Sequence, residues 1–179
     1  MYAALLLLTA AVVLLLLPSS LAAFQANLGA VAQTRAELSR YTWPGVPIQD
    51  ALRRDPSVNL DPAIAYYQAA LARSPANATA NRRLGQIELS RGQYDAGRRH
   101  LQAAYDAAPG RQAARFLPGE SYAITGEIDQ AAALWATIID RAGGNGAGLQ
   151  PFQARQYWYG SIGEKDKAAF IEKTLNVTR

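Results

Sequence analysis

Apolar side chains dominate the start of the chain. Residues 1–24 carry no charged side chain, and leucine and valine fill most of positions 5–17. From Tyr2 to Phe24 a helix would extend about 34 Å, which is enough to cross the roughly 30 Å hydrocarbon core of a bilayer. The pattern therefore predicts a transmembrane helix over residues 1–24.

A cleaved signal peptide is the alternative interpretation of this segment. Ser20, Leu21 and Ala22 form an acceptable cleavage site, because its first and third residues are small. However, no basic residue precedes the apolar run, whereas secretory signals carry a positive segment there. We therefore expect a retained anchor, which kinks or leaves the membrane at Pro18.

Large apolar residues then recur at intervals of three, four and seven, which is the spacing of one helix face. This stripe runs from Leu21 to Tyr41 and predicts a helical stalk over residues 25–43 that needs a surface to lie on. Two prolines and a glycine between Thr42 and Pro47 end the helical pattern.

The remaining chain, residues 44–179, repeats small and bulky positions every 34 residues. The positions that recur together are Ala63, Tyr67, Ala70 and Pro75, then Gly97, Leu101, Ala104 and Pro109, then Ala131, Trp135, Ile138 and Gly143. Gly85 and Gly92 step in the same way to Gly119 and Gly126. A fixed period of this length indicates a solenoid of helical hairpins.

The best copy, residues 78–111, resembles the tetratricopeptide repeat. That family has the pattern W-x2-L-G-x2-Y in its first helix, then A-x3-F and a proline in its second. Leu84-Gly85 fills the L-G pair, Leu101 fills the aromatic slot and Pro109 stands at the proline. The departures from the tryptophan, tyrosine and alanine slots are Asn81, Glu88 and Gly97.

Three glycines of this copy need a physical explanation, since each costs about 1 kcal/mol in a helix relative to alanine. Gly92 is expected to form the turn between the two helices, where a positive φ is inexpensive only for glycine. Gly85 and Gly97 are expected to let the helices approach each other closely.

Further copies are expected at residues 44–77, 112–145 and 149–179. The first is degenerate, with a short first helix near Ile48–Arg54, and Pro118 is expected to kink or delay the first helix of the third. The predicted fold class is all-α, an N-terminal transmembrane helix followed by a short solenoid of tetratricopeptide-type hairpins. Each hairpin buries its apolar face only against its neighbours.

The sequence offers little for catalysis. It has no cysteine and a single histidine, His100, and its acidic residues are scattered. A general base needs partners that hold and orient it, and a metal site needs several ligands together. We therefore expect no enzyme activity, no metal, no cofactor, no small-molecule substrate and no nucleic acid.

The family resemblance implies that the inner face of the first helices binds partner segments. The matching positions that we select are Arg82, Gln86, Ser90, Phe116, Glu120 and Tyr157. The alternative is that Phe116 and Tyr157 are buried between repeats.

A second hypothesis concerns charge. Eight arginines but only three acidic residues lie between Arg73 and Arg115. Arg98 and Arg99 are therefore candidates for a basic face toward lipid headgroups or an acidic protein. An ordinary solvated helix surface is the plainer interpretation of the same residues.

These features predict a single-pass membrane protein with a non-catalytic interaction scaffold. Its expected partners are the lipid bilayer and other subunits of a respiratory, photosynthetic or transport complex, which it serves as an accessory or assembly subunit. The expected location is the inner membrane of a bacterial cell. Arg35 and Arg40 follow the span, so the positive-inside rule places the repeats in the cytoplasm. The alternative function is a free-standing, membrane-tethered adaptor or chaperone that binds client peptides.

Overall fold

The structure is a computed structural model that describes residues 2–41, 49–110, 112–141 and 146–178. Side chains are left out of that description at residues 2–16, 112–114, 141 and 146–147. All regular elements in the described part are α-helices, as predicted. The chain divides into two compact units, residues 1–84 and 85–179, and each is described by itself.

The first unit contains α1 (Tyr2–Leu38), α2 (Gln49–Arg54), α3 (Asp61–Arg73) and the first half of α4 (Ala78–Ser90). α1 passes through Pro18 without a break, so the apolar opening and the expected stalk belong to one helix. Within the described part, no helix combines the length and hydropathy that a membrane span requires. The predicted span over residues 1–24 depends largely on side chains that lie outside that part.

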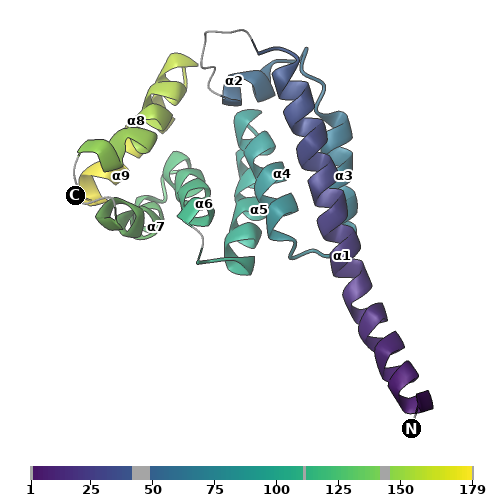
Figure 1. Cartoon of the computed structure of the whole chain (residues 1–179). Coiled ribbons are helices and arrows are strands. Elements are labelled where there is room, and N and C mark those ends of the chain that lie inside the picture. The colour runs from purple at the N-terminus through teal and green to yellow at the C-terminus, as the bar shows by residue number, and fades with distance from the viewer. Residues whose placement is uncertain (1, 42–48, 111, 142–145, 179) are drawn as a thin grey trace. The chain divides into compact units, whose positions relative to one another are not determined.

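α1 packs along α3, and the two helices lie side by side in the first unit (Figure 1). Gly29 of α1 faces the ring of Tyr67 in α3, and a Cβ atom on residue 29 would lie 2.6 Å from the Cε1 atom of that ring. Ala22 and Ala26 continue the buried side of α1 toward its N-terminus. Small side chains along one face thus allow the two backbones to approach.

This pairing corrects the expectation that the first hairpin begins with a short helix near Ile48–Arg54. That helix exists as α2, but its six residues are too few to cover α3. The C-terminal half of α1 therefore supplies the first helix of the hairpin. The boundaries proposed for the repeats remain predictions.

A chain of buried polar side chains joins α1, α2 and α3. Tyr67 donates its hydroxyl hydrogen to Gln33 Oε1 (2.7 Å), and Gln33 Nε2 donates to Glu37 Oε1 (2.7 Å). Arg53 Nε donates to the same Glu37 oxygen (2.8 Å), and Arg53 Nη2 donates to Gln49 (2.8 Å). Burial raises the pKa of Tyr67 to about 12, so its hydroxyl stays a neutral donor.

The second unit contains the rest of α4, α5 (Tyr94–Ala107), α6 (Gln112–Ile124), α7 (Ile128–Arg141), α8 (Gly146–Ser161) and α9 (Lys165–Thr178). α6 pairs with α7 and α8 pairs with α9, while α9 also packs against both α6 and α7. α6 begins at Gln112 and runs through Pro118, so the expected delayed start is wrong, while the alternative expectation of a kink at Pro118 stays a prediction.

The glycines of the second unit behave as the sequence predicts. Gly92 and Gly126 have φ values of 77° and 84° in the turns between paired helices, and Gly163 repeats this at 84°. A Cβ on Gly85 would lie 2.7 Å from Leu101 Cγ, and a Cβ on Gly97 would lie 3.0 Å from the Leu89 side chain. Both positions therefore require glycine for close helix packing.

The third copy makes the same kind of glycine contact, but with a larger side chain. A Cβ on Gly119 would lie 2.3 Å from Trp135 Nε1, and Trp135 is fully buried. Gly119 and Trp135 stand 34 positions after Gly85 and Leu101. The sequence period is thus repeated as a physical contact.

Candidate protein-binding site

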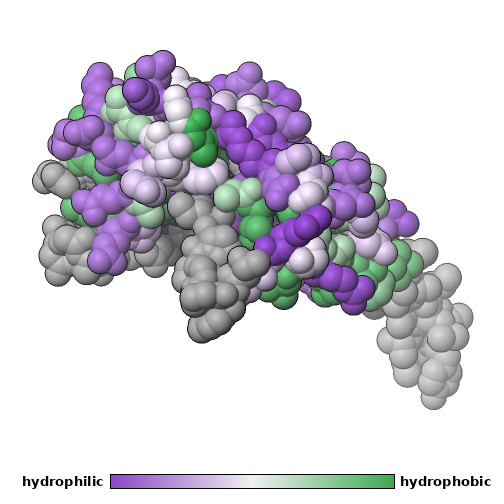
Figure 2. Space-filling model, turned by 90° about the horizontal axis from the view of Figure 1, so that it is seen from above, coloured by the Kyte–Doolittle hydropathy of each residue, from purple (hydrophilic) through white to green (hydrophobic). Residues whose placement is uncertain are grey.

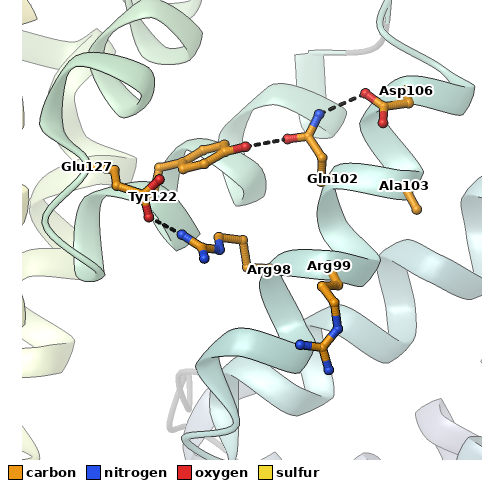
Figure 3. A pocket seen from close by; sticks show the side chains of 7 residues that line it. All are labelled: Arg98, Arg99, Gln102, Ala103, Asp106, Tyr122 and Glu127. Atoms are coloured by element: carbon orange, nitrogen blue, oxygen red, sulfur yellow. Dashed lines mark hydrogen bonds and ion pairs between the residues drawn. The ribbon is translucent and has the colours of Figure 1, made fainter.

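A pocket of about 460 Å³ opens in the second unit beside α5 and the end of α6 (Figure 3). Its α5 residues lie three and four positions apart, so they share one face of that helix. Tyr122 comes from α6, and Glu127 comes from the turn between α6 and α7. The complete lining is Arg98, Arg99, Gln102, Ala103, Asp106, Tyr122 and Glu127.

Most polar groups of this pocket pair with one another. Arg98 forms an ion pair with Glu127, and its guanidinium lies 5.8 Å from the centroid of the Tyr122 ring. Tyr122 donates to Gln102 Oε1 (3.0 Å), and Gln102 Nε2 donates to Asp106 (2.7 Å). The Tyr122–Gln102 bond thus links α6 to α5, and the Arg98–Glu127 pair links α5 to the turn that follows α6.

Arg99 stands apart from this network. Its side chain is exposed and points away from the other labelled residues (Figure 3). The two arginines of the lining are matched by two carboxylates, Asp106 and Glu127. The predicted basic face therefore depends on Arg99 and stays a prediction.

Glu120, one of the predicted inner-face residues, is fully buried. Its Oε1 accepts hydrogen bonds from Arg155 Nη2 (2.6 Å) and from the hydroxyl of Tyr159 (2.9 Å). Burial, followed by the neighbouring Glu120 charge, raises the pKa of Tyr159 well above its usual value. This carboxylate fastens α8 to α6.

Phe116 belongs to a group of three aromatic rings. Its centroid lies 5.1 Å from that of Phe152 and 6.2 Å from that of Trp135, and these two lie 4.7 Å apart. Trp135 Nε1 also donates a hydrogen bond to the Phe116 carbonyl oxygen (3.0 Å). Phe116 is half-buried, so most of its ring contributes to packing in the second unit.

The other predicted residues differ in exposure. Ser90 is buried and its hydroxyl donates to the carbonyl oxygen of Gln86 (2.8 Å). Arg82 and Gln86 are half-buried, and Arg82 belongs to the first unit. Tyr157 is 72% exposed on α8 and is the most accessible of the set. The inner-face site as a whole remains a prediction.

A family model described as "Tetratricopeptide repeat" matches residues 59–111 and, overlapping them, residues 88–147. The chain belongs to the tetratricopeptide repeat family. The matched residues cover α3 to α7 and leave out α1, α2 and α9. No curated protein matches the chain.

Tetratricopeptide repeats are typically non-catalytic scaffolds that bind protein partners. His100, the single histidine, lies 2.7 Å from a Glu88 carboxylate oxygen, and this contact joins α5 to α4. Across the described ranges, no three residues among His, Cys, Asp and Glu stand together as a metal site requires.

Several residues that position these surfaces were missed by sequence reasoning. Gln33 and Glu37 lie four apart on α1, and Arg155 stands 35 positions after its partner Glu120. The four-residue spacing of Gln33 and Glu37 was a usable signal, because polar residues at that spacing share a helix face. Nothing in the sequence pattern pairs Arg155 with Glu120.

Proposed function

We propose that this chain is a non-catalytic scaffold that binds another protein as an accessory or assembly subunit of a larger membrane complex. The observation that carries the proposal is an apolar stripe on the outer face of α1. Its large exposed members are Leu17, Leu21, Phe24, Val31 and Leu38.

The stripe lies on residues of α1 other than those that pack on α3. Phe24 and Leu38 are 60% and 62% exposed, whereas Ala22 and Ala26 are buried. Hydrophobic surface is visible next to the grey N-terminal residues (Figure 2). Contiguous exposed apolar surface of this kind marks interaction sites in proteins.

The spacing of the stripe indicates the shape of the partner. Leu17, Phe24, Val31 and Leu38 follow one another at seven-residue intervals, which is the repeat of helix-to-helix seams. A shallow groove of about 690 Å³ runs beside Val31 and Leu38. These features support an apolar helix of another subunit as the occupant.

Membrane attachment is part of the proposal and rests on sequence alone. The leucine-rich residues 2–16 precede the stripe without a charged side chain. Arg35 and Arg40 follow them, which supports a cytoplasmic location for the repeats under the positive-inside rule. Carbonate extraction tests the attachment: the full chain is expected in the pellet, and its release into the supernatant would contradict this part.

The complex is tested by mild detergent extraction followed by size and composition measurement. The wild-type chain is expected in a large particle with other subunits at fixed stoichiometry. Val31→Lys is expected to lower recovery of those subunits at least tenfold. A monomeric wild-type chain would overturn the subunit proposal and favour the membrane-tethered adaptor that binds client peptides.

Val177→Lys is the matched control for this experiment. Val31 is 58% exposed and Val177 is 57% exposed, and both lie on helices. Neither change is expected to alter the free energy of unfolding by more than about 0.5 kcal/mol, as for most surface substitutions. Equal loss of subunits from the two variants would rule out the α1 stripe as the docking surface.

A further inference from the structure

The outer face of α1 carries one charged residue among its apolar ones. When Leu28 and Arg35 are added to the exposed apolar members, the residues follow one another at alternating intervals of four and three. That alternation is the heptad spacing of a coiled-coil seam. The seven residues that form this α1 seam are Leu17, Leu21, Phe24, Leu28, Val31, Arg35 and Leu38.

The α1 seam lies on the side of α1 that faces away from α3. Val31 is two residues from both Gly29 and Gln33, so it points about 160° away from each of them around the helix axis. Gly29 faces the ring of Tyr67, and Gln33 accepts the hydrogen bond of the Tyr67 hydroxyl. Val31 and Leu38 are more than half exposed. A partner can therefore cover the seam without displacing α3.

The shallow groove beside Val31 has the arrangement of a coiled-coil hole. Its lining includes Val31 and the residues three, four and seven positions later, which are Thr34, Arg35 and Leu38. Four residues at this spacing form the hole that receives one side chain of a facing helix. The groove is therefore suited to a helix that packs along α1.

Arg35 brings a positive charge to this hole. Its guanidinium is exposed and has no hydrogen bond or ion pair within the part of the chain that the structure describes. Glu37 is the single acidic residue of α1, but it is buried, and Arg53 and Gln33 donate to its Oε1. A partner that covers the seam takes Arg35 out of water, which is costly unless the partner supplies an acceptor. The charge of Arg35 thus calls for a carboxylate on the partner.

A second copy of the chain does not supply that carboxylate. In a parallel pair of α1 helices in register, the two Arg35 side chains would lie opposite each other and repel. A different register does not help, because the acidic residue that α1 contains, Glu37, is already bonded to Arg53. The charges therefore favour a different protein.

We propose that the α1 seam docks a helix of another protein, with apolar residues at heptad spacing and one aspartate or glutamate beside Arg35. The apolar residues pack into the holes of the seam, and the carboxylate accepts N–H groups of the Arg35 guanidinium. This ion pair fixes the register of the two helices. The inference rests on the proposed function and names the chemistry of the subunit that the scaffold binds.

The test uses the full chain in its native membrane, with the photo-cross-linking residue p-benzoylphenylalanine in place of Val31. Irradiation is expected to join the chain to another protein. Mass spectrometry of the adduct is expected to find a cross-linked segment with apolar heptad spacing and an acidic residue within one helical turn. The same photo-cross-linker in place of Val177 is the matched control and is expected to miss this segment.

Three outcomes of the cross-linking would overturn the proposal. They are an adduct of two copies of the chain, a cross-linked segment without an acidic residue, and the absence of an adduct from position 31.

Exchange of charges tests the ion pair itself. Arg35→Glu is expected to lower the cross-link yield from position 31 at least tenfold, whereas Arg35→Lys keeps most of it because the positive charge remains. Arginine in place of the identified acidic residue, combined with Arg35→Glu, is expected to restore at least half of the yield. An undiminished yield with Arg35→Glu alone, or no restoration by the exchange, would refute the pairing.

Arg40→Glu is the control for this exchange. Arg40 is exposed and lies outside the seam, but it belongs to the same group of charges that follows the leucine-rich residues. Its substitution is expected to leave the cross-link yield unchanged. An equal loss from Arg40→Glu and Arg35→Glu would assign the effect to net charge and overturn the pairing.

Failure of this proposal differs from failure of the proposed function. A large particle of fixed stoichiometry in which position 31 meets no acidic helix would leave the subunit function standing and overturn the docking proposal. A chain that is monomeric in mild detergent and gives no adduct in the membrane would overturn both.

Discussion

Gly29 of α1 lies so close to the ring of Tyr67 in α3 that no side chain fits at position 29 without a shift of that ring. The second unit contains the same relationship between Gly85 and Leu101. It recurs between Gly119 and Trp135. One glycine of a first helix thus receives one large side chain of a second helix in each of these three hairpins.

Gly29→Ala is expected to lower the free energy of unfolding by about 1–3 kcal/mol, as overpacking of a well-filled core does. The Tyr67 ring has little freedom to move away, because its hydroxyl is bonded to Gln33. Gly160→Ala is the control, since its Cβ would meet only the Ala168 Cβ at 4.0 Å. That control is expected to gain up to about 1 kcal/mol from better helix propensity. Urea unfolding of the two variants measures the difference, and equal stabilities would refute it.

Glu120→Ala is expected to destabilise the second unit by about 3–5 kcal/mol, because it leaves the Arg155 guanidinium partly buried without this carboxylate. The double variant Glu120→Leu with Arg155→Met removes both charges and is expected to recover most of that loss. Thermal unfolding followed by circular dichroism gives both values. A mild effect of Glu120→Ala alone would mean that Glu120 is available to a partner after all.

Tyr157→Ala and Tyr159→Ala are expected to differ sharply, although the residues are two apart. Tyr157 is 72% exposed, so its loss should change stability by no more than about 0.5 kcal/mol. Tyr159 is buried and bonded to Glu120, so its loss should cost about 3–5 kcal/mol. Partner recovery then tests the inner face: if a folded Tyr157→Ala variant retains all partners, Tyr157 is not a contact.

Alkaline pH is expected to destabilise the fold through two buried tyrosines. The pKa of Tyr67 is raised to about 12 and that of Tyr159 is raised as well, against about 10 in an unfolded chain. Above pH 10 the unfolded state releases these protons while the folded state keeps them. The stability that is fully present below about pH 10 is therefore lost as pH rises toward about 12.

Urea unfolding at several alkaline pH values measures this slope, and tyrosinate absorbance reports the ionisation. Tyr159→Phe is expected to flatten the slope, since phenylalanine carries no proton to release. A slope that is the same in wild type and in this variant would assign the alkaline loss to other groups.

The 34-residue period predicted the turn glycines and the glycine contacts of the second unit, because each of these features depends on the residue at a single position of the repeat. The same period could not predict the first hairpin. Gly29 precedes Gly85 by 56 positions instead of 34, so the chain between α1 and α3 shifts it out of phase. Only the packing of α1 on α3 shows that Gly29 plays the part of Gly85.

The candidate site was less predictable for a related reason. Glu120 was selected because its position in the family faces a partner, yet in this chain Arg155 from α8 occupies the place beside it. That contact depends on how two hairpins stack, and the spacing of apolar residues does not encode it. The prediction for Tyr157 required only that its face of α8 be exposed, and Tyr157 is exposed in the structure.

The buried polar chain of the first unit also determines how the molecule responds to a mechanical pull. A force on the N-terminal end of α1 acts along the helix axis and tends to slide α1 past α3. A slide of one turn would part Tyr67 from Gln33 and Glu37 from Arg53 in the same movement. These bonds therefore bear the force together and break together. A pull on α1 would leave α1 bound to the repeats up to a threshold force and would then detach it abruptly.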